Sequence, residues 1–215
     1  MLRRGWWGSG KDSRLPETDA KGTSMPGRSW TADVAYRIDG QDRITFVNAA
    51  WDAFARRNGA PDLIGQRVRG TELWEYIADK ETRHLYGLLF AQVRRTGQPI
   101  TIPFNCDSPT CRRFMELRLA ALPEGALALT GHLLREEARE PAPLLDPRTA
   151  RSQSLLCICS WCKRIEAGTD DWIEVQEAIR RWSLFSAAVL PQLTHGICPT
   201  CRSLLDGRLH RKASP

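Results

Sequence analysis

The stretch Cys159-Ser160-Trp161-Cys162 contains a pair of cysteines separated by two residues. A second pair with the same spacing follows further along the chain, in His195-Gly196-Ile197-Cys198-Pro199-Thr200-Cys201. A Cys-x-x-Cys turn places both sulfur atoms on one side of a tight loop. Two such turns can therefore supply the four thiolates of a closed, tetrahedral zinc site. The sequence predicts a structural zinc ion held by Cys159, Cys162, Cys198 and Cys201.

Two further side chains lie close to these pairs in the sequence. Cys157 precedes Cys159, and His195 precedes Cys198, so either could replace a thiolate at the metal. Four cysteines are the favoured set of metal ligands, because the two Cys-x-x-Cys pairs can reach one metal ion without any further distortion of their loops. We expect His195 to donate a ring N–H near the metal, with ligation as the alternative. We expect Cys157 to be a buried and inert thiol, with a redox-sensing thiolate as the alternative.

The segment between the two cysteine pairs is expected to contain a helix. Asp171 and Glu174 have the spacing of a capping box, which predicts a helix with Asp171 as its N-cap. Apolar residues then recur at helical spacing, at Val175, Ile179 and Trp182. The whole Cys-rich module is expected to span residues 155–205.

A module of this size has a marginal core unless a metal or disulfide holds it together. We therefore expect metal removal to unfold residues 155–205 while the rest of the chain survives. This expectation predicts two separate unfolding transitions after chelation.

Charge is concentrated at the two ends of the chain. The formal net charge is +6, and residues 1–30 and 202–215 each carry a surplus of three positive charges, so the body between them is close to neutral. A nucleic-acid-binding domain usually carries its basic surface on the fold itself. A nucleic-acid partner is therefore disfavoured, and a DNA-binding transcriptional regulator is kept only as an alternative. Residues 1–30 are predicted to be a disordered leader and residues 206–215 a basic tail.

The apolar segments favour a cytoplasmic protein with no membrane partner. None of them reaches the roughly 18 residues that a membrane-spanning helix needs. The first residues carry positive charge but lack the apolar core of a secretory signal. In the reducing cytoplasm the cysteines are expected to stay free of disulfides.

The apolar pattern between residues 33 and 135 predicts an α+β domain. It alternates over residues 34–47, which favours a β-hairpin turning at Asp39-Gly40. Helical spacing follows, and the longest helix is expected to run from Asp79 to Gly97 with Leu85, Leu88, Leu89 and Val93 on its apolar face. Alternation then returns in three segments, within residues 100–133. The result is a five-stranded antiparallel sheet with helices on one face.

This order of elements, with Asn48 opening the first helix and a Gly97-x-Pro99 break after the long one, resembles the PAS sensory domain over residues 31–135. The resemblance implies a module that senses a small ligand, cofactor or partner and passes a change along its sheet. It also implies a pocket between the sheet and the long helix. By position, the residues lining it would be Trp51, Phe54, Leu85, Leu89, Phe104 and Leu117, most of which are equally explained as core.

Residues 136–154 contain three prolines and many charged residues, which predicts an extended, semi-rigid linker. The Cys-rich stretch after it resembles a tail found behind PAS domains and in other bacterial signalling proteins. That resemblance assigns no activity to the module.

Three other residues are candidates for sensing chemistry. Cys106 and Cys111 flank a short loop and could form a reversible disulfide, although two free thiols are the expected state in a reducing compartment. His84 lies early in the long helix, from which some haem-binding PAS domains supply their iron ligand. Its offset from the apolar face favours an exposed histidine.

The sequence favours a cytoplasmic signalling or regulatory protein and not an enzyme. It has no nucleotide-binding glycine loop and no recognisable catalytic triad, and a four-thiolate zinc leaves no open position for water. We expect a PAS sensor coupled to a structural-zinc interaction module, with output through a partner protein or through a second copy of the chain. The alternative is a redox or haem sensor using the cysteines or His84.

Overall fold

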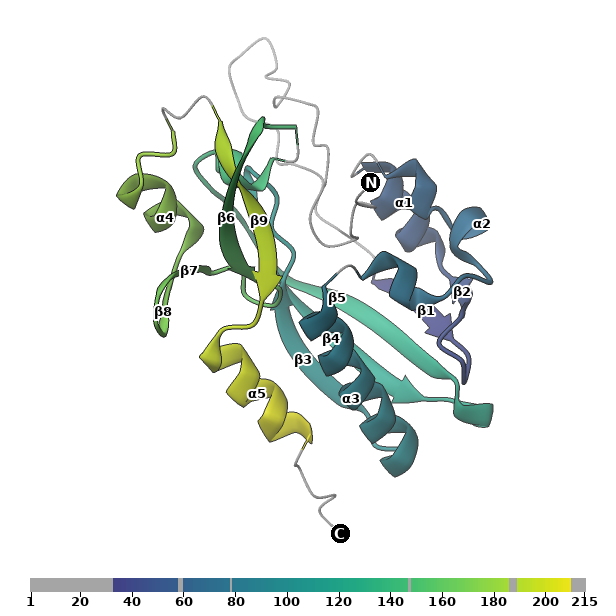
Figure 1. The fold of residues 1–215 in the computed structure, drawn as a ribbon. Helices are drawn as coiled ribbons and strands as arrows, with labels where there is room; N and C mark the ends of the chain where they lie inside the picture. Colours follow the sequence, from purple (N-terminus) through teal and green to yellow (C-terminus); the bar gives the residue numbers. More distant parts are fainter. Residues whose placement is uncertain (1–32, 58–59, 78, 147, 186–188, 210–215) are drawn as a thin grey trace.

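The computed structural model describes residues 33–57, 60–77, 79–146, 148–185 and 189–209 (Figure 1). The predicted leader, residues 1–30, lies outside this part of the chain. Within it, no helix is both long enough and apolar enough to span a membrane.

The first half of the structure is a five-stranded antiparallel sheet with the order β2-β1-β5-β4-β3. Its strands are β1 (Val34–Ile38), β2 (Ile44–Val47), β3 (Ile100–Asn105), β4 (Cys111–Ala121) and β5 (Leu127–Ala138). The first hairpin pairs beside the three later strands through β1 and β5, as the alternating pattern predicts. The α+β fold class and the PAS-like arrangement are therefore confirmed.

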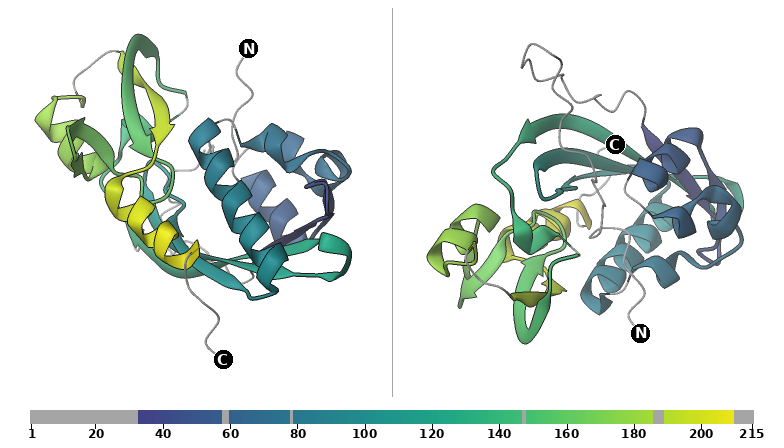
Figure 2. Two further views of the ribbon diagram at one scale, coloured as in Figure 1. Left: turned by 60° about the horizontal axis from the view of Figure 1, so that its bottom comes forward. Right: turned by 90° about the horizontal axis from the view of Figure 1, so that it is seen from above.

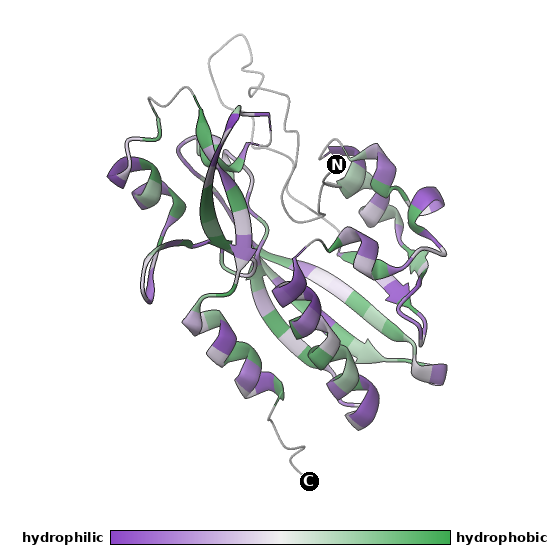
Figure 3. Cartoon of the chain, viewed as in Figure 1, coloured by the Kyte–Doolittle hydropathy of each residue, from purple (hydrophilic) through white to green (hydrophobic). Residues whose placement is uncertain are grey.

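Helices cover one face of this sheet (Figure 2). They are α1 (Ala49–Arg57), the short α2 (Gly65–Val68) and α3 (Lys80–Thr96), with single 3-10 turns at Pro61–Leu63 and Leu73–Tyr76. A further 3-10 turn, Pro123–Gly125, connects β4 to β5. Hydrophobic and hydrophilic residues are mixed along α3 and along the strands (Figure 3), as expected for elements that bury only one side.

The ends of α3 are set by local signals that the sequence shows directly. The Asp79 carboxylate accepts a hydrogen bond of 2.6 Å from the backbone N–H of Thr82, which caps the N-terminus. Gly97 adopts φ 69° and closes the C-terminus in the left-handed conformation that glycine tolerates best. Both predicted boundaries are confirmed.

The apolar face of α3 differs from the prediction at one position. Leu85, Leu89 and Val93 are buried, but 40% of Leu88 is exposed. The buried stripe also includes Tyr86 and Phe90, so its centre is rotated away from Leu88 around the helix axis.

A β-bulge changes which residues of the first hairpin face the core. The β1–β2 register shifts between Arg37 and Ile38, and Ile44 and Val47 are the buried residues of β2. Phe46, which simple alternation would place inward, is 38% exposed, and the Arg37 guanidinium lies 5.0 Å from its ring centroid. An extra residue in one strand reverses the inward and outward positions that follow it.

The second half is a smaller four-stranded sheet with the order β8-β7-β6-β9. Its strands are β6 (Arg151–Cys159), β7 (Ile165–Gly168), β8 (Asp171–Ile173) and β9 (Leu190–Gly196), and it carries α4 (Val175–Arg181) and α5 (Pro199–Leu209). We call residues 151–209 the C-terminal module. β6 and β9 run parallel, whereas the other neighbours are antiparallel.

The helix expected between the cysteine pairs exists but begins later than predicted. Asp171 is not its N-cap, because residues 171–173 form β8 and pair with β7. The helix starts at Val175, after Glu174. Pairing with a neighbouring strand therefore outweighs the capping-box spacing, which is a local signal.

The predicted linker, residues 136–154, is not extended throughout. It contains the end of β5, a 3-10 turn at Pro143–Leu145 and the start of β6, and both Ala142 and Leu144 are completely buried. Arg151 donates hydrogen bonds to the carbonyl oxygens of Leu144 (2.9 Å) and Asp146 (2.8 Å). The charged residues of this segment favour a solvated linker in the sequence, but in the structure Arg151 is held by these two carbonyl groups.

The two halves meet in one hydrophobic cluster, and the C-terminal module has a second, smaller cluster of its own, which includes Ile158, Ile165 and Ile179. Cys159, Trp161, Cys198 and Leu205 are buried in the same cluster as the residues between the large sheet and α3. α5 contacts both α3 and β3, and Figure 2 shows it beside α3 on the same side of the sheet. Leu205 is fully buried and α5 continues to Leu209, so residues 206–209 of the expected tail are helical, and the rest of that tail lies outside the described residues. Separate melting of the two halves after chelation stays a prediction, since they share one cluster but the C-terminal module also has its own.

Leu89→Ala is expected to lower the free energy of unfolding by about 2–5 kcal/mol, because it removes a fully buried side chain and leaves a cavity. The matched control is its neighbour Leu88→Ala, which should cost less than about 1 kcal/mol because the side chain is largely exposed. Urea denaturation followed by tryptophan fluorescence measures both. Equal losses for the two variants would contradict this placement of α3.

Candidate metal centre

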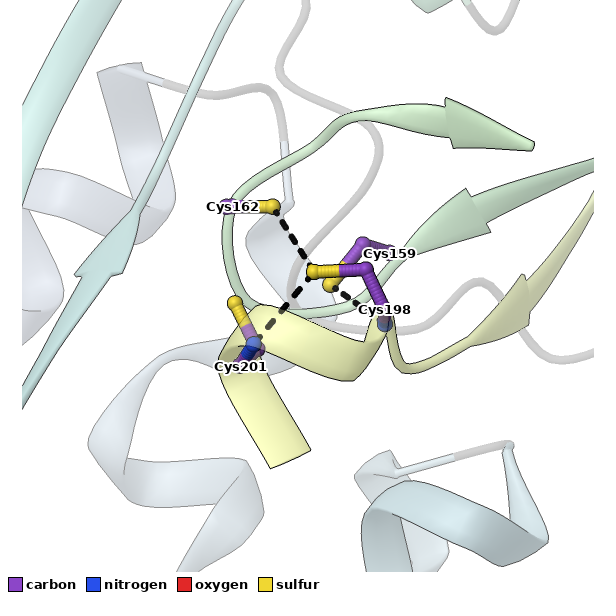
Figure 4. Close-up of side chains that lie close together, drawn as sticks. All are labelled: Cys159, Cys162, Cys198 and Cys201. Carbon is purple, nitrogen blue, oxygen red and sulfur yellow. Dashed lines mark hydrogen bonds between the residues drawn. The ribbon is translucent and has the colours of Figure 1, made fainter. Parts of the chain in front are cut away.

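Four cysteine sulfurs converge where the C-terminal module meets the large sheet. The sulfur atoms of Cys159, Cys162, Cys198 and Cys201 all lie within 4.8 Å of one another (Figure 4). A tetrahedral Zn–S site with bonds of about 2.3 Å requires sulfur atoms about 3.8 Å apart. The Cys162 and Cys198 sulfurs are 3.6 Å apart, close to that value. This group of side chains could hold a metal ion, and it consists of the four predicted cysteines.

The parallel pairing of β6 and β9 brings the two cysteine pairs together. Cys159 ends β6 and lies opposite Gly196, the last residue of β9, so both strands deliver their following loop to the same place. The backbone N–H of Ser160 donates to the Gly196 carbonyl at 2.9 Å. Cys198 immediately precedes α5, and Cys201 lies in its first turn, where Pro199 suits the start of a helix.

Backbone N–H groups point at the sulfur atoms. The Cys198 N–H donates to the Cys159 sulfur at 3.5 Å, and the Cys201 N–H donates to the Cys198 sulfur at 3.4 Å. Such bonds favour the thiolate form that a metal requires.

The pKa values of the cysteines also reflect their close packing. Hydrogen bonds from the Cys162 and Cys201 thiols hold the pKa of Cys159 far below its usual range. The bond to Cys159 raises the pKa of the Cys162 thiol to about 12. A divalent cation bound here would take the place of the thiol protons, because metal binding requires the thiolate form.

Lys163, to which the sequence assigned no role, is a buried cation beside this site. Its side chain is only 5% exposed, and its ammonium donates to the Ser160 carbonyl at 2.7 Å. Burial lowers the pKa of Lys163, while the nearby Cys106, Asp107 and thiolates of the cluster raise it. Four thiolates around a divalent metal carry a net negative charge, which a buried ammonium at this position would partly offset. In the sequence, the only sign that Lys163 lies beside the site was its position directly after Cys162.

The two additional candidates lie outside the group of four. His195 lies on β9 opposite Ile158 and is exposed. Its predicted hydrogen bond near the metal stays a prediction. Cys157 lies on β6 and is only partly buried, whereas a buried thiol was expected. Desolvation still raises the pKa of its thiol, which favours the inert, protonated form.

Most of the predicted pocket residues belong to the core between the large sheet and the helices. Trp51, Leu85, Leu89, Phe104 and Leu117 are buried in one cluster. Phe54 is buried as well but lies outside that cluster. The indole N–H of Trp51 donates to the Leu63 carbonyl at 2.7 Å. Their burial fits the explanation as core, and their role as ligand contacts stays a prediction.

The backbone of Cys106 pairs across the loop with Arg113 and not with Cys111. The Cys106 N–H donates to the Arg113 carbonyl at 2.9 Å, and Cys111 is bridged to Ser108. Burial raises the pKa of both thiols, that of Cys111 to about 12, so both are protonated near neutral pH. These features do not favour a redox pair.

His84, the candidate haem ligand, is exposed on α3, whereas its neighbour Leu85 faces the core. This position agrees with the exposed histidine expected from the sequence.

No protein-family model matches the chain, and no curated protein matches it. Among solved structures, the chain is similar to the photoactive yellow protein domain of the sensor histidine kinase Ppr from Rhodospirillum centenum. The identity is 17%, and the match covers 46% of this chain and 84% of that domain, with a TM-score of 0.36. A TM-score this low supports no conclusion about function, so the fold class rests on the strand order and helix placement described above.

Gly196→Ala is expected to destabilise the C-terminal module by about 1–3 kcal/mol through overpacking. A Cβ at Gly196 would lie 2.8 Å from the Cys157 sulfur, closer than such atoms can approach. Chemical denaturation measures the loss, and Cys157→Ala in the same chain should restore part of it. The matched control is Gly207→Ala in α5, where a Cβ meets nothing within 4 Å and helix propensity favours alanine. Equal stability of the Gly196 and Gly207 variants would contradict this close approach.

Proposed function

We propose that this protein is a signalling or regulatory protein in which a PAS-like sensor acts together with a zinc-stabilised C-terminal module. The observation that carries the proposal is the convergence of four cysteine sulfurs at the place where that module packs against the sensor. A metal there would fix the module on the sensor instead of at the end of a flexible linker.

Zinc is the metal that best fits a set of four thiolates. It accepts tetrahedral sulfur coordination, and sites of this kind are closed and structural. A closed shell offers no position for a substrate or for an activated water. We therefore propose a structural role for the metal and no enzymatic activity for the chain.

The signal would leave the sensor through a partner. The proposed partner is a protein of a signalling pathway or a second copy of this chain, with nucleic acid and membranes disfavoured by the charge and apolar patterns. A four-thiolate zinc site requires reduced cysteines, which fits the cytoplasm. The redox and haem alternatives gain no support from Cys106, Cys111 or His84 in their observed positions.

The proposal predicts one zinc ion per chain in protein purified without added chelator. Cys159→Ser, Cys162→Ser, Cys198→Ser and Cys201→Ser should each abolish zinc binding, because each removes one thiolate of a closed site. Metal analysis combined with thiol counting measures the outcome.

Cys157→Ser is the matched control, because Cys157 lies beside the site on the same strand but outside the group of four. It should retain the full zinc content. Protein that contains no zinc yet keeps a folded C-terminal module would contradict the proposed site. A visible absorption spectrum typical of haem or of an iron–sulfur cluster would instead support the alternative sensor class.

A further inference from the structure

The loop of the first cysteine pair also contacts the sensor. We call residues 159–163 the first Cys loop. Trp161 in this loop is 4% exposed, and its ring centroid lies 5.6 Å from that of Tyr86 on α3. The Trp161 carbonyl accepts a hydrogen bond of 2.7 Å from the backbone N–H of Asn105, the last residue of β3. The Asn105 side chain donates to the Cys162 carbonyl at 3.3 Å.

The same loop is hydrogen-bonded to the N-terminal turn of α3. The hydroxyl oxygens of Ser160 and Thr82 are 2.8 Å apart, and the Thr82 hydroxyl lies 2.6 Å from the Asp79 carboxylate. An ionised carboxylate only accepts, so Thr82 gives it the hydroxyl proton and receives one from Ser160. Asp79 is the cap of α3. A continuous chain of hydrogen bonds therefore joins the first Cys loop to the start of the sensor helix.

The second cysteine pair reaches α3 through α5. Leu205 is completely buried in the sensor core, and Arg202 forms an ion pair with Glu81 in the first turn of α3. Cys198 and Cys201 lie at the start of the same α5. Both cysteine pairs thus sit on segments that contact the first two turns of α3.

We infer that metal occupancy and the docked conformation of the α3 N-terminus are energetically coupled, so that the metal centre regulates how the sensor helix is held. The inference rests on the proposed zinc site. The contacts of Ser160 and Trp161 need the loop geometry that a metal fixes by holding Cys159 and Cys162 together. Coupling of two sites is reciprocal, so a change that disturbs the first turns of α3 must weaken metal binding, and metal loss must loosen those turns.

The first experiment measures metal affinity in the full-length chain, with Co²⁺ as a probe because its thiolate complexes absorb light. Competition against a chelator of known affinity should show that Thr82→Val and Tyr86→Leu each weaken Co²⁺ binding by about fivefold or more, in the usual range for coupled sites. Both substitutions lie on α3 and leave all four cysteines in place. Tyr86→Phe keeps the ring opposite Trp161 and should bind Co²⁺ as the unmodified chain does.

Val93→Ala is the matched control. Val93 is completely buried near the other end of α3, so the substitution weakens the sensor core without touching the first Cys loop. Its Co²⁺ affinity should stay within about twofold of the unmodified chain, a difference small beside typical coupling. An equal loss of affinity for Val93→Ala and Thr82→Val would overturn the inference, since it would show general destabilisation.

The second experiment tests the reverse direction by hydrogen exchange. Chelation should accelerate exchange of the backbone amides in the first two turns of α3, around Thr82 and Tyr86. Unchanged exchange there after complete metal removal would overturn the coupling.

The outcomes separate this inference from the proposed function. If the chain binds neither Co²⁺ nor Zn²⁺, the proposed metal site and the coupling are both wrong. If it binds metal through the four cysteines but with the same affinity in every α3 variant, the metal site stands and only the coupling is wrong.

Discussion

Parallel pairing of β6 with β9 is the interaction on which the C-terminal module depends. The two strands are far apart in sequence, and their pairing sets Cys159 opposite Gly196. That register brings the loops after both strands to one point, and the four sulfurs converge there. Closing such a long loop costs conformational entropy, which the small apolar cluster of the module offsets only in part. A metal at this point would link the ends of the loop and supply the missing free energy.

The contact between the C-terminal module and the proposed sensor combines apolar packing with buried charge. Trp161 and Leu205 enter the sensor core. Arg139 forms an ion pair of 2.9 Å with Asp107, with each side chain only 3% exposed, and it also donates a hydrogen bond to the Gln176 side chain on α4 of the module. Burial raises the pKa of Asp107 and lowers that of Arg139, which shows the cost of removing both from water. Buried charges tolerate few alternative geometries, so this pair favours one orientation of the module.

α3 connects the two regions to which the proposal gives a function. Its first turns carry Thr82 and Tyr86, which contact the first Cys loop, and its middle carries Leu85 and Leu89, which lie in the sensor core. A helix is stiff over this length, so a displacement at one end is transmitted to the other. In the proposed sensor, a ligand in the core and a metal at the cysteines would therefore act on the same element.

The sequence by itself determined the features that depend on neighbours in the chain. Alternating and helical apolar spacing gave the five strands and α3, the side chain of Asp79 and the conformation of Gly97 set the ends of α3, and the two Cys-x-x-Cys turns identified the group of four sulfurs. Tertiary structure alone decided the rest. Strand pairing placed Asp171 in β8, and a bulge exposed Phe46. Leu144 and Lys163 are buried, although the charged and proline-containing segment around Leu144 and the charge of Lys163 both favour exposure to solvent. The role of Trp161 as a contact with α3 was also invisible in the sequence. Local periodicity records which side of an element is apolar, but it holds no information on which distant surface that side will meet.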